Sequence, residues 1–230
     1  MNVIITMAGK GTRAKNLFHT KKNKYAIEVH GKSMLERSLN GLKELFCQHF
    51  IFIVRSEFEE RSLLVEVTTK LGIKHWDIAF VEGDTNGQAT SALAAKPKLD
   101  SMDSIIIYNI DTEIVDFLDF PKNFAENDGW LLVTQVEGTR WSFVKSKNGL
   151  MTDVAEKRRI SNQASVGMYG FKSFDVFEQL YLNHVDAVIR EYGESYISPL
   201  YKFLLKSGLV AISNIPRKQV KFLDYEKDIS

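Results

Sequence analysis

Four short apolar runs in the first half of the chain constrain its fold more than any other feature. They lie at residues 2–7, 49–54, 78–82 and 104–109. Helical patterns occupy the segments between them, at about 34–46, 57–71 and 86–96. Apolar strands joined by helices are typical of a parallel sheet that is covered on both faces. We therefore predict an α/β fold with a mostly parallel central sheet and helices on both of its faces.

Capping residues indicate where these helices begin and end. Ser33 and Glu36 have the capping-box spacing, so the first helix is expected to begin there and to run to about Phe46. Gly72 is expected to follow the C-terminus of the second helix. Pro97 is expected to stop the third helix, because the residue before a proline avoids the helical conformation.

The second half of the chain has closely spaced strand patterns. These are predicted at 130–136, 142–145, 150–155, 164–171, 209–213 and 219–224. Helices are predicted at 173–191 and 198–206, the second with Ser198 as its N-cap and Pro199 as its first residue. This part of the chain is expected to form a small antiparallel extension of the sheet.

The composition indicates one globular domain and excludes several classes of protein. The chain has 230 residues, of which 44% are hydrophobic and 26% are charged. A net charge of +1 provides no overall field that would attract nucleic acid or an anionic membrane. The single cysteine, Cys47, rules out an internal disulfide and is expected to be a small buried residue. No signal peptide or long apolar run is visible, so we expect a cytoplasmic protein.

The first predicted strand runs directly into a glycine-rich turn. Gly9 and Gly11 allow the backbone to bend sharply and to approach a polyphosphate closely. Backbone N–H groups in such a turn can point at phosphate oxygens, and Arg13 and Lys24 supply positive charge. When the turn is taken alone, an ordinary strand-to-loop turn with surface cations explains it equally well.

Two other phosphate-binding motifs fit this turn poorly. The P-loop pattern G-x-x-x-x-G-K-[ST] does not occur in the chain. The dinucleotide fingerprint would accept Ala14 as its third small residue, but that fingerprint must open a helix. Residues 14–24 lack apolar helical periodicity, so we predict a cationic loop there.

Two aspartates are placed where strands are predicted to end. Asp111 comes directly after the apolar run, and Asp224 ends the last predicted strand. Ligands of open α/β sheets bind at the carboxyl ends of strands, where one or two carboxylates can hold Mg²⁺ together with substrate phosphates. The alternative for Asp111 is a cap of a following helix.

Two further segments are suited to bind other parts of a substrate. Lys157 could bind an anionic acceptor, while Glu156 beside it could orient a hydroxyl or an amine. In the connection that begins at Glu82, Gly87 allows close backbone approach, and the amide of Gln88 suits a base or a ribose. A charged turn and a simple helix start are the alternatives for these two segments.

Taken in order along the chain, these segments resemble the sugar-phosphate nucleotidyltransferase superfamily, especially compact members such as phosphocholine cytidylyltransferase-like and capsule-locus enzymes. The matching segments are Gly9 to Arg13, Lys24, Glu28 to Leu35, Gly87-Gln88, Asp111, Glu156-Lys157, Val166 to Phe171 and Phe222 to Asp224. The chain departs from the family at Asn23, where proline is usual, and in the residues after Asp224. The resemblance implies a Rossmann-like nucleotidyltransferase fold over residues 1–230, with an NTP-binding half at about 1–112 and an acceptor-binding half at about 113–230.

The resemblance also implies a role for each segment. Arg13 and Lys24 would be catalytic, and Asp111 and Asp224 would bind Mg²⁺. The acceptor would be bound by Glu156 and Lys157. The residues implied in NTP binding are Ala8, Gly9, Gly11, Thr12, Arg13, Lys24, Glu82, Gly87 and Gln88.

The implied reaction transfers a nucleoside monophosphate from an NTP, with CTP favoured, to a small phosphorylated acceptor and releases pyrophosphate. A sugar phosphate, phosphocholine and phosphoglutamine all fit as acceptors, and the implied role is the decoration of a surface polysaccharide such as a capsule. The alternative is a non-catalytic nucleotide-sensing domain with the same fold, which would be expected to lose its charged site residues. The expected partners are the two substrates, without nucleic acid or membrane, and a homodimer is left open.

Overall fold

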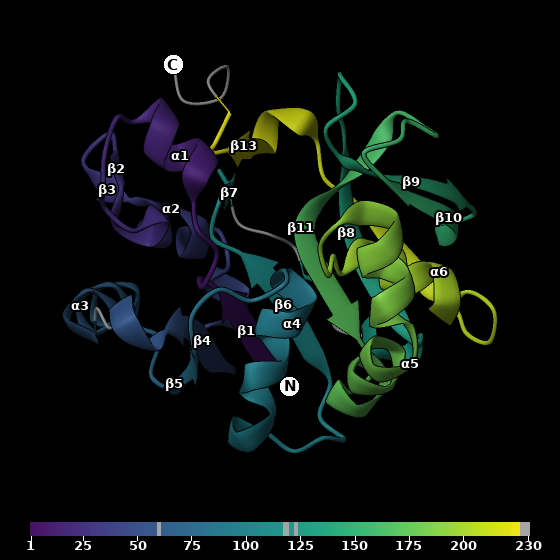
Figure 1. Ribbon diagram of the computed structural model, residues 1–230, viewed down its shortest axis with the longest axis horizontal. Helices are drawn as coiled ribbons and strands as arrows, with labels where there is room; N and C mark the ends of the chain where they lie inside the picture. Colours follow the sequence, from purple (N-terminus) through teal and green to yellow (C-terminus); the bar gives the residue numbers. More distant parts are fainter. Residues whose placement is uncertain (59–60, 117–119, 122–123, 226–230) are drawn as a thin grey trace.

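The computed structural model describes residues 1–58, 61–116, 120–121 and 124–225, apart from the side chains of Arg13 and Phe58. Its centre is a nine-stranded sheet with the order β5-β4-β1-β6-β11-β8-β12-β10-β9 (Figure 1). The strands are β1 (Asn2–Thr6), β4 (His49–Arg55), β5 (Trp76–Val81), β6 (Ile105–Asn109), β8 (Gly129–Gln135), β9 (Ser142–Lys147), β10 (Leu150–Glu156), β11 (Gln163–Phe171) and β12 (Val210–Asn214).

The four strands from the first half of the chain are parallel. β1 pairs with β4 on one side and with β6 on the other, and β4 also pairs with β5. The carboxyl ends of β1 and β6 therefore lie at one edge, where Thr6 is the register partner of Asn109. Beyond β6 the sheet is mixed, because β11 is antiparallel to both β6 and β8. The α/β class is confirmed, whereas a mostly parallel arrangement holds only for this first half. Among the later strands β12 pairs with β8 in parallel, but β11, β10 and β9 form antiparallel pairs.

The second half closes into a ring of five strands. β8, β12, β10 and β9 follow β11 in order, and β9 pairs back with β11 at Phe143 and Ala164. The ladder between β11 and β8 is interrupted between Ser165 and Tyr169. Gly167 lies in this interruption with φ +84°, a conformation that glycine adopts without strain. The curved strand β11 thus belongs both to the open sheet and to the ring (Figure 1).

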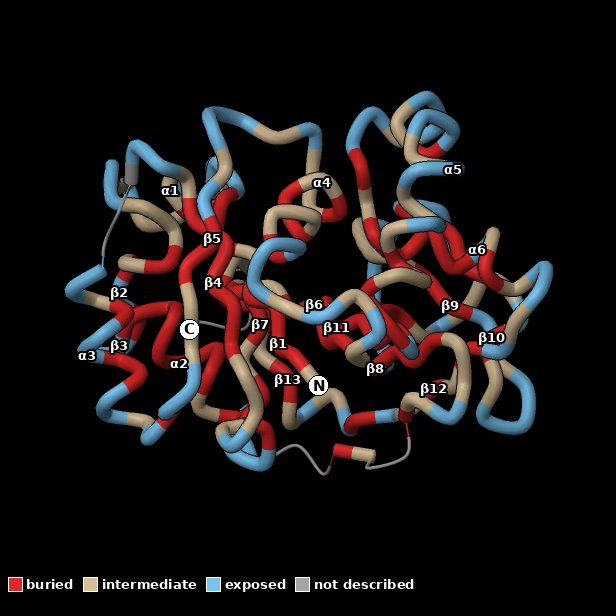
Figure 2. Tube along the Cα trace, turned by 90° about the horizontal axis from the view of Figure 1, so that it is seen from below, coloured by how far each residue is buried: buried red, intermediate tan, exposed pale blue. Residues whose placement is uncertain are grey.

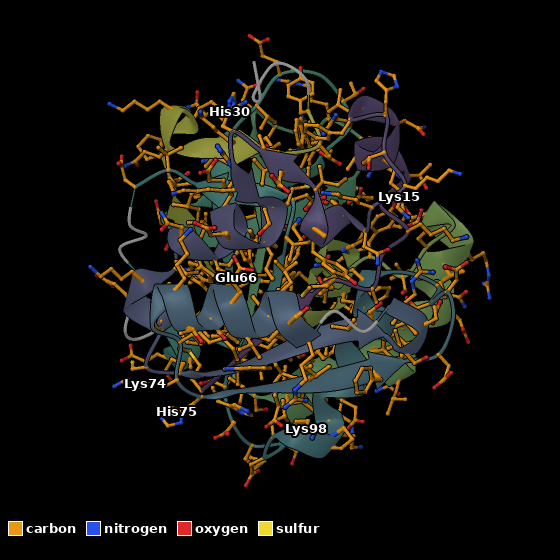
Figure 3. The ribbon with its side chains drawn as sticks, turned by 90° about the vertical axis from the view of Figure 1, so that its left-hand side faces the viewer. Lys15, His30, Glu66, Lys74, His75 and Lys98 are labelled. Carbon is orange, nitrogen blue, oxygen red and sulfur yellow. The ribbon has the colours of Figure 1, made fainter. Side chains whose placement is uncertain are left out.

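Helices cover both faces of the sheet, as predicted. On one face Val3 and Ile5 of β1 pack with residues of two helices, and on the other face Ile4 packs with residues of three. The helices are α2 (Met34–Asn40) and α3 (Arg61–Leu71) on the first face, and α4 (Gln88–Ala92), α5 (Phe174–Tyr192) and α6 (Tyr201–Leu204) on the second. Figure 3 shows α3 on the outside of the first face, where the labelled Glu66 is exposed.

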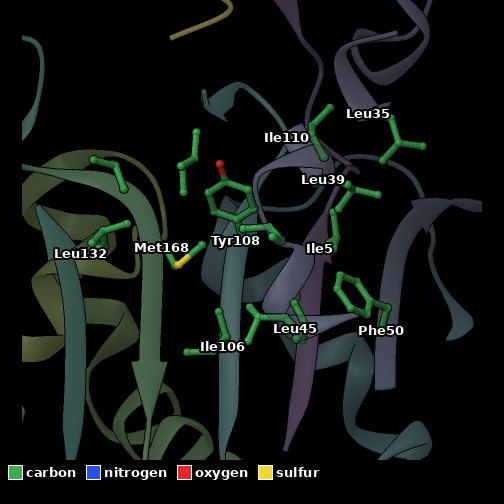
Figure 4. Packing of buried hydrophobic residues seen from close by; sticks show 14 of the residues in the cluster. Ile5, Leu35, Leu39, Leu45, Phe50, Ile106, Tyr108, Ile110, Leu132 and Met168 are labelled. Carbon is green, nitrogen blue, oxygen red and sulfur yellow. The ribbon is translucent and has the colours of Figure 1, made fainter. Parts of the chain in front are cut away.

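Buried residues follow the strands and the inward sides of the helices (Figure 2). In the cluster on the first face, Ile5, Phe50, Tyr108 and Met168 come from four neighbouring strands (Figure 4). Only alternate residues of a strand can enter such a cluster, because successive side chains point to opposite faces. The core therefore fixes the register of β1, β4, β6 and β11, and with it the position of the strand ends.

The capping signals at Ser33 and Gly72 are confirmed, although the first helix is shorter than predicted. Ser33 caps α2, since its Oγ accepts a hydrogen bond from the N–H of Glu36 at 3.1 Å. Gly72 follows α3 with φ +80°. α2 ends at Asn40, and a separate 3₁₀ helix follows at Lys43–Leu45.

The next two helices also differ from the predicted ranges. α3 begins at Arg61, while its predicted start at 57 falls in a 3₁₀ helix, Ser56–Phe58, and residues 59–60 lie outside the described part of the chain. α4 ends at Ala92, and a 3₁₀ helix continues from it at Leu93–Lys98. Pro97 lies inside that 3₁₀ helix, so it does not mark the end of helical structure.

A short helix, α1 (Thr12–Leu17), begins directly after the glycine turn. Ala14 is fully buried in a cluster with Ile27 and Leu223, and Phe18 packs against the same cluster. The prediction of a cationic loop at 14–24 is therefore wrong in its first part. Tertiary packing against distant segments stabilises this helix, and local periodicity carries no sign of such packing.

Three short strands and one cysteine also differ from the predictions. The three unpredicted strands are β2 (Glu28–Val29) and β3 (Lys32–Ser33), which form a small hairpin, and β7 (Thr112–Ile114). β7 pairs with β13 (Val220–Phe222), which lies within a predicted strand. Cys47 is exposed rather than buried, because it follows a helical turn at the surface. Among the described residues, no helix has the length and apolar character needed to cross a membrane.

Candidate functional site

A cleft of about 640 Å³ lies where the carboxyl ends of β1 and β6 meet strands of the ring. Its walls come from the glycine turn, the connection between β5 and α4, the segment after β6 and the connection between β8 and β9. Ligands of open α/β sheets bind at such an edge, so this cleft is the candidate substrate site. The predicted site residues that line it are Ala8, Gly9, Gly11, Thr12, Lys24, Gly87, Gln88, Asp111, Glu156 and Asp224.

Three other predicted site residues are not placed among the lining residues. Glu82 is exposed, and its carboxylate accepts a hydrogen bond from Ser56 Oγ at 3.2 Å. Lys157 is also exposed, and its Nζ donates to Oη of Tyr196 at 2.6 Å. The backbone of Arg13 is in α1, and its side chain lies outside the described part of the structure.

The glycine turn and Lys24 are in direct contact. Gly11 has φ +66°, and a Cβ at this position would lie only 2.8 Å from Cβ of Lys24. Lys24 therefore packs against the turn, and its Nζ forms an ion pair with Oδ2 of Asp111. The two side chains are 15% and 16% exposed, which leaves the pair within reach of a ligand. At this depth charges interact more strongly than at the surface, because less water screens them.

The short β7–β13 ladder brings Asp224 close to Asp111. At its end the N–H of Leu223 donates to the carbonyl oxygen of Asp111 at 2.7 Å. The side chain of Asp224 accepts a hydrogen bond from Nη2 of Arg140 at 3.0 Å. Both aspartates line the cleft, so the structure brings together the two residues that the sequence assigned to a metal.

The donor set of this wall fits Mg²⁺. In the described part of the chain, no group of three or more His, Cys, Asp and Glu side chains is arranged to hold a metal. A metal between Asp111 and Asp224 would thus need further oxygen ligands from a substrate and from water. Mg²⁺ is commonly bound in this way, through one or two carboxylates together with substrate phosphates.

The connection between β5 and α4 is held close to Ser195. Gly87 has φ +138°, and a Cβ at this position would lie 2.7 Å from the backbone N of Ser195. The same N–H donates to the carbonyl oxygen of Asn86 at 2.7 Å. Gln88 is turned towards the end of β1, where its Nε2 donates to Oγ1 of Thr6 at 2.9 Å. Glycine is therefore required at position 87 to let the backbone approach Ser195 closely.

An ion pair joins the glycine turn to this same connection. Nζ of Lys10 lies 2.9 Å from Oδ2 of Asp84, and Nη1 of Arg55 lies 2.7 Å from Oδ1 of Asp84. The hydrogen bond from Lys10 lowers the pKa of Asp84 below its usual value. Lys10 and Asp84 both line the cleft. The negative charge of Asp84 is therefore already neutralised there by Lys10 and Arg55.

Glu156 is a buried carboxylate at the end of β10. It accepts hydrogen bonds from Oγ of Ser142 and, at 3.2 Å, from Oγ of Ser198. Burial raises the pKa of Glu156, while the two serine hydroxyls oppose this shift. The prediction of Ser198 as an N-cap is wrong, because Ile197 occupies that position and the Ser198 hydroxyl is bonded to Glu156.

Lys157 is separated from the cleft by the side chain of Tyr196. Its Nζ lies 4.8 Å from the centre of the Tyr196 ring, in addition to donating to the hydroxyl. The hydrogen bond to Tyr196 raises the pKa of Lys157 above its usual value. Tyr196 itself lines the cleft, so the lysine is one side chain away from a bound molecule.

Two residues that the sequence did not identify, Arg140 and Trp141, also line the cleft. The guanidinium carbon of Arg140 lies 4.5 Å from the centre of the Trp141 ring, and that ring lies 4.3 Å from the ring of Phe222. Both residues are in the connection between β8 and β9. An isolated Arg-Trp pair before a strand is not a motif, so the local sequence carries little signal of this role.

Gly167→Ala is expected to destabilise the protein by about 2–5 kcal/mol, the sum of a positive-φ strain and an overpacking cost. A Cβ at Gly167 would lie 2.1 Å from Nδ2 of Asn109, and φ is +84°. Asn109 lies at the end of β6 and lines the cleft, so its side-chain amide would have to turn away to admit the methyl group. Urea unfolding followed by circular dichroism measures the change in the free energy of unfolding.

Gly149→Ala is the matched control for this substitution. Gly149 has a similar φ of +76°, but a Cβ there would meet no atom of the described residues within 4 Å. The difference between the two variants therefore isolates the contact with Asn109. Equal losses of stability would show that the contact contributes nothing and that the backbone strain explains both results.

Comparison with known proteins places the chain among enzymes of one family. No model of a protein family matches it, and no curated protein matches it either. The solved nucleoside-diphosphate-sugar pyrophosphorylase from Vibrio cholerae RC9 is 32% identical, with a TM-score of 0.87 over 99% of this chain and 97% of that chain.

Two more distant solved structures share the fold. The inositol-1-phosphate CTP transferase from T. maritima is 16% identical, with a TM-score of 0.71 over 100% of this chain and 91% of that chain. A UDP-glucose pyrophosphorylase complexed with UDP-glucose is 12% identical, with a TM-score of 0.74 over 99% and 95%. The identity to the Vibrio cholerae protein extends over nearly the whole of both chains, and the segments that carry the sequence resemblance mostly meet in one cleft. The chain belongs to the sugar-phosphate nucleotidyltransferase superfamily.

Proposed function

We propose that the protein transfers a nucleoside monophosphate from an NTP to a small phosphorylated acceptor and releases pyrophosphate. The observation that carries this proposal is the meeting of the glycine turn, the Lys24–Asp111 pair, Asp224 and Glu156 in one cleft. A nucleotide-sensing domain would need the turn but would not need a second set of polar groups for an acceptor. The charged residues of both halves are present, which favours the enzyme over this alternative.

The proposed NTP is CTP, and the proposed acceptor is a sugar phosphate, phosphocholine or phosphoglutamine. CTP is favoured because the chain is compact like the cytidylyltransferases it resembles. A role in the decoration of a surface polysaccharide such as a capsule is part of the same proposal.

In the proposed mechanism an oxygen of the acceptor phosphate attacks the α-phosphorus of the NTP, and pyrophosphate leaves. The acceptor is already an anion, so no side chain has to act as a nucleophile. Catalysis then depends on positioning and on neutralising charge. Mg²⁺ bound by Asp111 and Asp224 would supply further positive charge at the phosphates.

In this mechanism some residues of the cleft would bind the NTP and others would bind the acceptor. Backbone N–H groups of the glycine turn, with Arg13, would hold the β- and γ-phosphates. Lys24 would contact the α-phosphate and the acceptor phosphate, at the point where charge develops in the transition state. Glu156, fixed by two serine hydroxyls, would accept a hydrogen bond from the body of the acceptor.

A matrix of four NTPs against a panel of phosphorylated acceptors tests this proposal, with pyrophosphate release as the readout. We expect release only when an NTP, an acceptor and MgCl₂ are all present, and we expect the fastest release with CTP. EDTA should abolish it. Binding of an NTP in calorimetry without pyrophosphate release from any pair would favour the nucleotide-sensing domain.

Lys157→Ala is expected to raise the KM for the acceptor roughly tenfold, because Tyr196, which lines the cleft, would lose its hydrogen bond to a charged group. The KM for the NTP should change little, because Lys157 is on the ring and not at the glycine turn. Steady-state kinetics with each substrate varied in turn measures both values. Arg158→Ala, an exposed neighbour, is the control and should change neither. A defect confined to the NTP would place Lys157 in the triphosphate site.

A further inference from the structure

Arg140 is the basic side chain that the ring presents to the cleft. Among the side chains that the structure describes, the lysines and arginines lining the cleft are Lys10, Lys24 and Arg140. Lys10 belongs to the glycine turn, and Lys24 packs directly against that turn. Arg140 approaches instead from the connection between β8 and β9, in the acceptor half of the chain. An anion bound on the side of the cleft formed by the ring would therefore be close to the positive charge of Arg140.

The contacts of Arg140 hold its guanidinium in one place. Its Cζ lies 4.5 Å from the centre of the Trp141 ring and 4.6 Å from the centre of the Tyr225 ring. Its Nη2 donates to Oδ1 of Asp224 at 3.0 Å. Stacking on aromatic rings and a planar arrangement of donors make such an arginine a preorganised binder of phosphate, because little freedom is lost on binding.

The hydrogen bonds of this guanidinium are incomplete in the structure. Its Nε is buried from solvent and has no acceptor among the described residues. A guanidinium has five N–H donors in a fixed fork, and the bond to Asp224 uses one of them. The side chain as a whole is 33% exposed, so a molecule in the cleft can reach it. The fork is thus held in position, but the described residues do not use all of its donors.

We infer that Arg140 binds the phosphate of the acceptor, a small phosphate monoester, and orients it for attack. This inference rests on the proposed function and deepens it. The phosphate would lie between Arg140 and Lys24, and the body of the acceptor would lie towards Glu156, with Trp141 beside it. The bond to Asp224 uses one donor of the guanidinium, and a phosphate monoester offers the bidentate partner that matches its fork.

Arg140→Gln and Arg140→Lys test this inference together, with Arg190→Gln as the matched control. Arg190 is an exposed arginine of α5 outside the cleft, so its loss changes the net charge equally. We expect Arg140→Gln to raise the KM for the acceptor at least tenfold and to change the KM for the NTP less than threefold. Arg140→Lys keeps the charge but not the fork, so it should recover only part of the loss. The control should match the unmodified protein.

Thermal unfolding and phosphate binding distinguish this role from a structural one. Calorimetric titration with inorganic phosphate should show weaker binding by Arg140→Gln than by the unmodified protein. An Arg140→Gln protein that unfolds at a lower temperature, but has an unchanged KM for the acceptor and unchanged phosphate binding, would overturn the inference. An equal rise in the KM for the NTP would overturn it too, because it would place Arg140 at the triphosphate. If Arg140→Gln does not fold, Arg140→Lys with an unchanged acceptor KM overturns it.

The same experiment separates this inference from the proposed function. An unmodified protein that releases no pyrophosphate with any substrate pair contradicts the proposed function. Phosphate binding that depends on Arg140 would still be measurable in that case, and would support the assignment of Arg140 as an anion-binding residue.

Discussion

Lys24→Ala is expected to lower the turnover number at least ~100-fold, the scale of losing one preorganised charge at a transition state. Lys24 is fixed on one side by contact with Gly11 and on the other by its ion pair with Asp111. An alanine would leave the glycine turn in place but would remove the charge that the proposed mechanism places at the reacting phosphates. The turnover number should therefore fall far more than the affinity for the NTP.

Lys22→Ala is the control for this variant. Lys22 belongs to the same segment, but its ion pair with Glu28, at 3.4 Å, is exposed on the surface. Exposed pairs contribute little, so turnover by the control should be normal. The measurement is pyrophosphate release at saturating substrates, with circular dichroism to show that both variants fold. Near-normal turnover by a folded Lys24→Ala protein would reject the assigned role.

Asp111→Asn is expected to abolish Mg²⁺-dependent turnover while the fold is retained. An amide oxygen is a weaker ligand than a carboxylate for a hard divalent cation. The substitution also removes the negative partner of Lys24, so two features of the cleft change together. Contacting residues are coupled, and the double variant with Lys24→Ala should lose less than the product of the two single effects.

A titration of pyrophosphate release against MgCl₂ measures this effect. Asp103→Asn is the control, since Asp103 precedes β6 at its other end and bonds to Asn2 at 2.9 Å. The control should show the same metal dependence as the unmodified protein. An Asp111→Asn protein with unchanged dependence on MgCl₂ would show that Asp111 is not a metal ligand.

Local sequence was sufficient to locate most elements of the fold. The apolar runs became β1, β4, β5 and β6, because buried parallel strands need continuous apolar side chains. Ser33 and Gly72 marked helix ends because capping depends on residues that are neighbours in the chain. These features require no knowledge of distant contacts.

The remaining features depend on contacts between distant segments. Ala14 is helical because Leu223 covers it, and a window of local sequence cannot contain both residues. The ring closes through a short pairing of β9 with β11, for which no pattern in either strand gives a signal. Cys47 is exposed although its neighbours Leu45 and Phe46 are apolar, because the helical turn there leaves it on the outer side.

The site shows the same division between local motif and distant contact. Lys24 and Asp111 were predicted separately, each from its own motif, and the structure pairs them although they are 87 positions apart. Arg140 is 84 positions from its partner Asp224 and belongs to no motif, so only the folded chain shows its place. The sequence points to Lys157 for binding of the acceptor, whereas among the described side chains Arg140 is the one from the β8–β9 connection that is basic and lines the cleft.

The closed ring of strands also sets an order of assembly. β8 pairs with β12 in parallel, from Gly129 and Val210 onwards, so the ring cannot close until β12 has been synthesised. The strands β1, β4, β5 and β6 can pair with one another earlier, whereas the ring of five strands can form only after this late segment is available. None of the described residues of β12 lines the cleft. Substitutions in β12 should therefore reduce the yield of folded protein during expression, and the molecules that do mature should keep their substrate preference.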